Sequence, residues 1–101
     1  MFIYNITTKV AAGIHDSWIS WMQEVHIPEV MATGFFISYR ILRILEIDDS
    51  EGPTYAIQYE CKALSDYHLY IAQESERLKK SVFDKWGNQT IAFRSFMEIV
   101  N

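Results

Sequence analysis

Cysteine is almost absent from this sequence, and so are several features that would narrow its function. Cys61 is the only cysteine among 101 residues, which excludes an internal disulfide and fits a reducing compartment, so we expect the cytoplasm. No apolar run approaches the length of a membrane span, and no basic segment leads a long apolar one. Lysine and arginine do not cluster among the aromatic residues and the formal net charge is −4, which argues against nucleic acid and anionic membranes as partners.

Motifs of common catalytic and metal sites are also missing. There is no Gly-rich phosphate loop, nucleophile elbow or dinucleotide-binding fingerprint. His15 and His26 would lie about 16 Å apart along one helix, too far to share a metal ion. The acidic segment 48–51 lacks the regular ligand spacing of a calcium loop. We therefore expect neither a metal nor a cofactor.

Hydrophobic residues are abundant instead. They make up 50% of the chain, and 15% of all residues are aromatic, which excludes a disordered protein. A chain of this length forms one domain, here residues 1–101, with a single core. The apolar content exceeds what a small monomer can hide, which indicates burial by a partner.

Residues 14–34 form the central helical segment of the prediction. Its apolar residues are spaced by four, three and four positions, which marks one buried helix face: Ile14, Trp18, Trp21 and Val25. Pro28 disfavours the α conformation at the preceding residue, so the helix is predicted to stop or kink after His26. His26 then lies at the edge between core and solvent. Its charge stays open, because the end of one helix and the start of the next turn act on it in opposite directions.

Four strands and a second helix complete the pattern. The strands are predicted at residues 2–10, 35–47, 54–62 and 89–100, and the second helix from Ser65, as N-cap, to Gly87, as C-terminal stop. The order βαββαβ indicates an α+β, ferredoxin-like fold, in which two helices cover one face of a four-stranded antiparallel sheet. Paired apolar residues in the second strand predict that both of its faces are covered. A second copy is the simplest cover, which predicts a homodimer through the sheet faces.

Several segments together resemble a known family. They are IYN at 3–5, WMQEVHIPEV at 21–30, ATGF at 32–35, the strand 55–59 and AFRS at 92–95. Over nearly the whole chain they resemble a family of short uncharacterised bacterial proteins, a domain of unknown function within the dimeric α+β barrel superfamily. The aromatic residue followed by His-x-Pro is similar to the helix end of stress-responsive and ethyl-ether-degradation-type members. The resemblance implies a dimeric barrel, but the superfamily includes monooxygenases, isomerases, cyclases, haem-degrading enzymes and members without known activity.

A polar set is predicted in the space between the two sheets. If the more apolar side of strands one, three and four faces the helices, the residues pointing away are Asn5, Gln58, Glu60 and Arg94. Arg40 or Arg43 joins them, depending on whether the second strand carries a bulge. Polar groups within an apolar cavity are typical of small-molecule pockets. The alternative is that Arg94 and Glu60 form ion pairs with a structural role.

His26 is the candidate acid or base, because the ordinary pKa of histidine lies near neutrality. The alternative is a helix-end histidine bonded to backbone. Trp21, with Trp18, could form the floor of a pocket for a planar ligand, or simply belong to the core. Cys61 is interpreted as an inert core thiol.

The sequence therefore predicts a homodimeric small-molecule-binding domain with a pocket between sheet and helices. The alternative is a cofactor-independent enzyme of the monooxygenase, isomerase or cyclase type. It would act on a small planar or anionic substrate, with His26 as acid or base and Arg94 and Gln58 orienting the substrate. No group of residues specifies the reaction.

Overall fold

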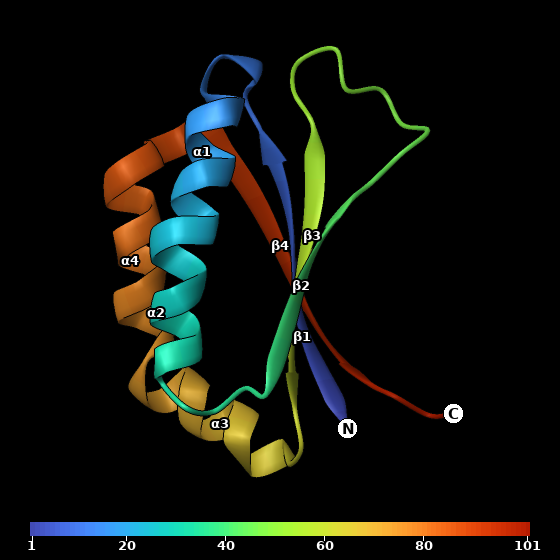
Figure 1. The fold of residues 1–101 in the computed structure, drawn as a ribbon, viewed down its shortest axis with the longest axis vertical. Coiled ribbons are helices and arrows are strands. Elements are labelled where there is room, and N and C mark those ends of the chain that lie inside the picture. The colour runs from blue at the N-terminus through green and yellow to red at the C-terminus, as the bar shows by residue number, and fades with distance from the viewer.

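The computed structural model describes residues 1–101 and has the predicted βαββαβ order. The strands are β1 (Phe2–Val10), β2 (Ser38–Arg43), β3 (Thr54–Cys61) and β4 (Thr90–Glu98). All pairings are antiparallel, and the order across the sheet is β2-β3-β1-β4. The helices cover one face of this sheet and leave the other face open (Figure 1). The predicted fold class is confirmed.

The first helical segment does not break where the sequence predicted. After a short 3-10 turn at Ala12–Ile14, α1 (His15–Trp21) continues through a π-helical turn (Met22–His26) into α2 (Ile27–Ala32). Within the π turn the Ile27 N–H bonds to the carbonyl of Met22, five residues back. Pro28 has no N–H to give to a regular α-helical bond, and the wider turn accommodates it. The predicted stop after His26 is therefore wrong, and the helix runs on through the π turn.

The π turn also moves the buried face of the helix. The buried residues are spaced by four, five and three positions: Trp18, Met22, Ile27 and Val30. The step of five is the extra residue that the wide turn contains. Val25, predicted on the buried stripe, is instead 38% exposed, because that prediction assumed regular α geometry throughout.

β2 is shorter than the strand predicted for residues 35–47. Phe36 precedes it and is buried in the core, whereas Leu45 and Ile47 follow it in an exposed loop. Within one chain, five of the six residues of β2 are exposed. The prediction that both faces of this strand are covered does not hold inside a single copy.

The second helix is divided into α3 (Leu64–Gln73) and α4 (Ser75–Trp86), with Glu74 between them. Ala63 occupies the N-cap position of α3, and its N–H donates to the carboxylate of Asp66 at 3.2 Å. The predicted cap at Ser65 is wrong, because this reverse bond from Asp66 begins the helix earlier. Gly87, with φ of 57°, ends α4 as predicted.

The core lies between the helices and the covered sheet face. Fourteen buried side chains form it, and the largest of them are aromatic. Cys61 is fully buried there, and burial raises the pKa of its thiol. None of the helices combines the length and apolarity that spanning a bilayer requires.

Candidate functional site

The two faces of the sheet carry different kinds of side chain. Residues paired across strands share a face, so Asn5 lies with its partners Gln58 and Ser95 on the open face. Glu60, two residues along β3 from Gln58, lies on the same face. These three predicted site residues, Asn5, Gln58 and Glu60, point away from the helices as expected.

Arg94 lies on the opposite face from the one predicted. It pairs across strands with Ile6, on the side that the helices cover. The open side of β4 instead carries exposed apolar residues: Ile91, Phe93 and Met97. The prediction assumed that the more apolar side of each strand faces the helices. That assumption fails on β4, an edge strand whose apolar side faces away from the core of its own chain.

A hydrogen-bonded network occupies the centre of the open face. Asn5 is only 7% exposed, and its amide nitrogen donates to the hydroxyls of Thr7 at 3.0 Å and Ser95 at 3.3 Å. Its amide oxygen accepts from Gln58 at 3.2 Å. Arg40 lies opposite Gln58, so Arg40 joins this face. The network is made within the sheet and lines no enclosed cavity.

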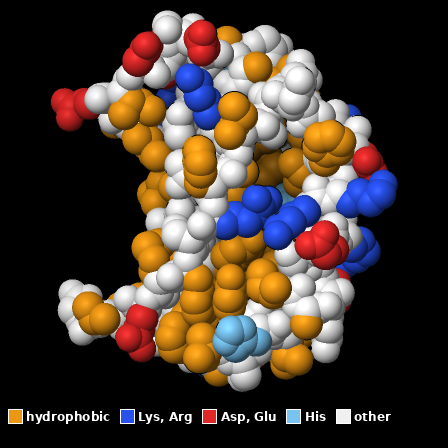
Figure 2. All heavy atoms as spheres, turned by 180° about the vertical axis from the view of Figure 1, so that it is seen from behind, with side chains coloured by type: hydrophobic (Ala, Val, Ile, Leu, Met, Phe, Trp, Pro, Cys, Tyr) orange, Lys and Arg blue, Asp and Glu red, His pale blue; other side chains and the backbone are white.

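The neighbouring polar residues are also engaged. The hydroxyl of Ser38 donates to the carboxylate of Glu60 at 3.0 Å. Arg43 lies opposite Tyr55, on the covered face, and pairs with Asp49 at 3.0 Å. Figure 2 shows the open side as a hollow between two projecting ends of the molecule, with hydrophobic side chains along it.

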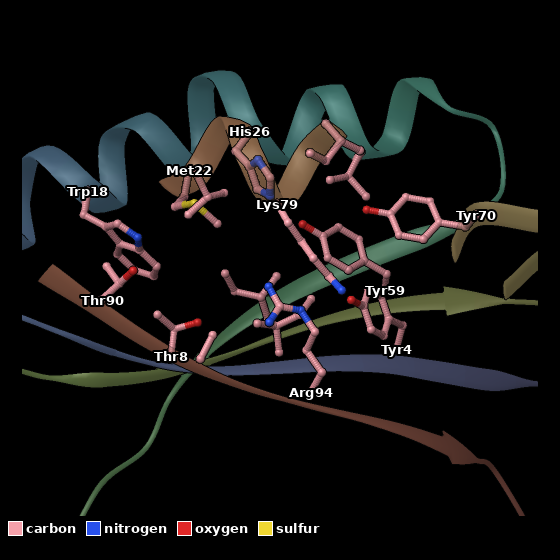
Figure 3. A pocket seen from close by; sticks show the side chains of 16 residues that line it. Tyr4, Thr8, Trp18, Met22, His26, Tyr59, Tyr70, Lys79, Thr90 and Arg94 are labelled. Atoms are coloured by element: carbon pink, nitrogen blue, oxygen red, sulfur yellow. The ribbon is translucent and has the colours of Figure 1, made fainter. Parts of the chain in front are cut away.

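The enclosed space lies on the other side of the sheet, beneath the helices. A cavity of about 60 Å³ is lined by sixteen side chains, eleven of them hydrophobic when its three tyrosines are counted as such. All four helices and three strands, β1, β3 and β4, contribute to it. Its polar wall is formed by hydroxyl, imidazole and cationic groups (Figure 3): Tyr4, Thr8, His26, Tyr59, Tyr70, Lys79, Thr90 and Arg94.

His26 projects from the π turn toward the sheet (Figure 3). Its ring stacks on Trp21, with centroids 5.5 Å apart and planes inclined by 17°. Its Nδ1 atom is buried and has no hydrogen-bond partner. Burial, and then the positive charge of Arg94, lower the pKa of His26 to about 4. The imidazole is therefore neutral at neutral pH, which answers the question of charge that the sequence left open.

Two cations reach the cavity from opposite walls. Arg94 rises from β4 and Lys79 descends from α4 (Figure 3). Arg94 is exposed and Lys79 half-buried, which places both where the cavity meets solvent. No aspartate or glutamate lines the cavity, and the four ion pairs of the chain involve neither cation.

Three tyrosines form the wall of the cavity beside Lys79. The ring of Tyr4 lies 6.4 Å from that of Tyr59 and 5.8 Å from that of Tyr70, and the three hydroxyls point into the cavity (Figure 3). Burial raises the pKa of each phenol. All three hydroxyls keep their protons at neutral pH and can donate hydrogen bonds.

The cavity brings together only two of the predicted site residues, His26 and Arg94. Trp21 lies outside the lining, against the back of His26, while Trp18 lines the cavity. The sequence reasoning missed Lys79 as a site residue. Lys79 comes three positions before Val82 on the inner face of α4, so a charged residue on an apolar stripe was the signal that could have found it.

The lining of the cavity offers several groups that can form hydrogen bonds. The lining has cations, neutral donors and an imidazole with an unused nitrogen. No three His, Cys, Asp or Glu side chains anywhere in the chain come close enough together to hold a metal. Such a site can hold a small molecule through hydrogen bonds and charge, with apolar walls around its body.

Comparisons with known proteins agree with this architecture. A crystal structure of a dimeric ferredoxin-like protein from an uncultured marine organism superposes with a TM-score of 0.68, at 16% identity, over 99% of this chain and 95% of that one. An ethyl tert-butyl ether d (EthD) family protein from Bacillus halodurans C-125 gives 0.69, at 13% identity, over 99% and 100% of the two chains. These similarities concern the fold.

No curated protein matches the sequence. A family model matches residues 1–100, and its description is a domain of unknown function, DUF4286. The match covers almost the whole chain. The chain therefore belongs to the DUF4286 family.

Proposed function

We propose that this chain is a homodimeric small-molecule-binding domain, with its ligand in the cavity between sheet and helices. The observation that carries the proposal is the lining of the cavity, where Arg94, Lys79 and the neutral ring of His26 stand among apolar side chains. A few polar groups in an otherwise apolar cavity are typical of small-molecule pockets.

The homodimer is supported by the open sheet face. Leu42, Ile91, Phe93 and Met97 are all exposed there in a single chain. Large apolar side chains exposed on one face of a sheet often mark an interface. The ferredoxin-like protein with the same fold is described as dimeric. A second copy that packs sheet against sheet would cover these side chains and leave the cavity, on the other side of the sheet, free.

A cofactor-independent enzyme is the second candidate, and the position of His26 at the cavity wall favours it. A general base works best when its pKa lies near the working pH. Since the pKa of His26 is lowered to about 4, the ring is a weak base at neutral pH. We therefore rank binding ahead of catalysis.

Ligand binding can be tested with a variant that fills the cavity. Ala92 lines the cavity from β4, so Ala92→Phe should occupy the ligand's space. Ala72 is exposed on α3, and Ala72→Phe adds the same ring at the surface as a control. A small-molecule library would be screened by ligand-observed NMR, and molecules carried through purification would be identified by mass spectrometry. We expect the native chain and A72F to bind the same compounds and A92F, checked for an intact fold, to lose them. Equal binding by A92F would contradict the proposal.

A further inference from the structure

We infer that the ligand of this cavity carries an anionic group, a carboxylate or similar oxyanion, held between Arg94 and Lys79. The inference rests on the proposed function and specifies the chemistry of its ligand. Two positive side chains converge on the cavity, and no acidic side chain lines it. The chain has thirteen acidic residues and nine basic ones, yet neither of these cations forms an ion pair. The charge that would balance them is missing from the protein.

The placement of the two cations suits an anion at the mouth of the cavity. Arg94 comes from the sheet and Lys79 from α4, so they approach from opposite sides (Figure 3). A guanidinium presents two parallel N–H groups that match a carboxylate, and an ammonium adds a compact charge. An oxyanion between them would make charge-assisted hydrogen bonds to both walls.

The deeper lining describes the rest of the ligand. Behind the cations lie apolar side chains such as Ile6, Ile57 and Val30, together with the tyrosine hydroxyls and the neutral His26 ring. A volume of about 60 Å³ encloses only a few non-hydrogen atoms, so the ligand's body is small. A compact acid with a small apolar body fits these walls, with its charge toward solvent and its body toward the π turn.

Matched pairs of probes separate charge from shape. Acetate and benzoate are the anionic probes, and acetamide and benzamide are neutral molecules of nearly the same shape. Binding at millimolar concentration and constant ionic strength would be followed by chemical shifts in 15N-labelled protein. We expect at least one anion to bind saturably, with shifts at cavity residues, and its amide counterpart to bind at least about tenfold more weakly.

Variants then assign the charge to the two cations. Arg94→Gln and Lys79→Gln should each weaken the anion about tenfold or more, and Arg94→Lys should weaken it less than Arg94→Gln does. Lys62→Gln removes an exposed cation that does not line the cavity and should change affinity less than about twofold. Melting temperatures would confirm that each variant is folded.

The outcomes distinguish this inference from the proposed function. If amides bind as tightly as acids, or if Arg94→Gln and Lys62→Gln have equal effects, the anionic ligand is wrong. The binding cavity still stands in that case, provided that Ala92→Phe abolishes the binding of neutral compounds. If neither anion binds while neutral compounds do, the inference is again wrong. If Ala92→Phe still binds every compound of both classes, the proposal that the cavity binds a ligand is wrong as well.

Discussion

The rings of Trp21 and His26 stack although the residues are five positions apart in one helix. In a regular α-helix, side chains five apart point about 140° away from each other. The π turn at Met22–His26 contains one more residue than an α turn, and it brings the two rings onto the same side. The turn that accommodates Pro28 thus also fixes the orientation of His26 at the cavity wall.

This stack should be measurable as a coupling energy. We expect a double-mutant cycle with Trp21→Leu and His26→Leu to give about 0.5 to 1.5 kcal/mol of coupling. Urea unfolding of the four proteins measures it. The control cycle combines Trp21→Leu with His68→Leu, an exposed histidine on α3, and should be additive. Additivity in both cycles would show that the stack contributes nothing beyond its separate parts.

The low pKa of His26 predicts acid sensitivity. The folded pKa, about 4, lies below the ordinary value of 6.5, so between these values the unfolded chain binds the proton and the folded chain does not. The contribution of His26 to the free energy of unfolding is complete above pH 6.5. It falls by about 2 to 3 kcal/mol as the pH drops toward 4.

His26→Gln should remove this part of the pH dependence, and His68→Gln should keep it. Urea unfolding at a series of pH values compares the two variants, and NMR titration of the imidazole gives the pKa directly. A midpoint for His26 near 6.5 would contradict the burial argument.

Replacing glycine by alanine should change the stability of the chain by very different amounts at two positions, Gly52 and Gly13. At Gly52, with φ of 141°, a Cβ would press against the Val10 carbonyl oxygen and lie 2.8 Å from the Ala12 nitrogen. The loop crosses β1 closely there, because Val10 and Ala12 donate backbone bonds to Pro53 and Glu51. Gly52→Ala should cost about 3 kcal/mol or more. Nothing lies within 4 Å of a Cβ at Gly13, so Gly13→Ala should stay within about 1 kcal/mol. Thermal unfolding tests both, and equal losses would be the contrary result.

Phe93 and Phe83 offer a matched test of the dimer. Phe93 is 71% exposed on the open face of β4, and Phe83 is 67% exposed on α4. Phe93→Asp should place a charge in the proposed interface and give monomers, whereas Phe83→Asp should stay dimeric. Sedimentation equilibrium of the native chain and both variants decides between these states. A native monomer, or a dimer that Phe93→Asp leaves intact, would rule out the sheet-to-sheet interface.

The order of strands and helices could be predicted from the sequence because side chains alternate with a period of two along the strands, and clear turn residues bound each strand. The predictions that were wrong concern features that depend on three-dimensional context. Pro28 signals a disturbed helix, but a kink and a π turn both accommodate a missing N–H, and only packing against the sheet selects between them. The faces of β4 could not be assigned, because an edge strand with apolar residues outward gives the same alternation as one with them inward.

The candidate site could be predicted only in part, for the same reason. His26 and Arg94 were singled out by residue type, but the side of the sheet on which Arg94 lies decides whether it meets His26 or Gln58. The buried tyrosines look like ordinary core residues in sequence, since only the fold shows that Tyr4, Tyr59 and Tyr70 turn their hydroxyls toward one space.

The network around Asn5 affects how the open face can be covered. Both amide hydrogens of Asn5 and its oxygen already have partners inside the sheet, at Thr7, Ser95 and Gln58. A layer laid over this centre would not have to supply donors or acceptors to Asn5, so dehydrating it is inexpensive. Recognition would then depend on the surrounding apolar side chains, whose identities can change without disturbing the amide they encircle. Because neighbouring residues such as Phe93 and Arg94 point to opposite sides of β4, substitutions on the open face leave the lining of the cavity unchanged.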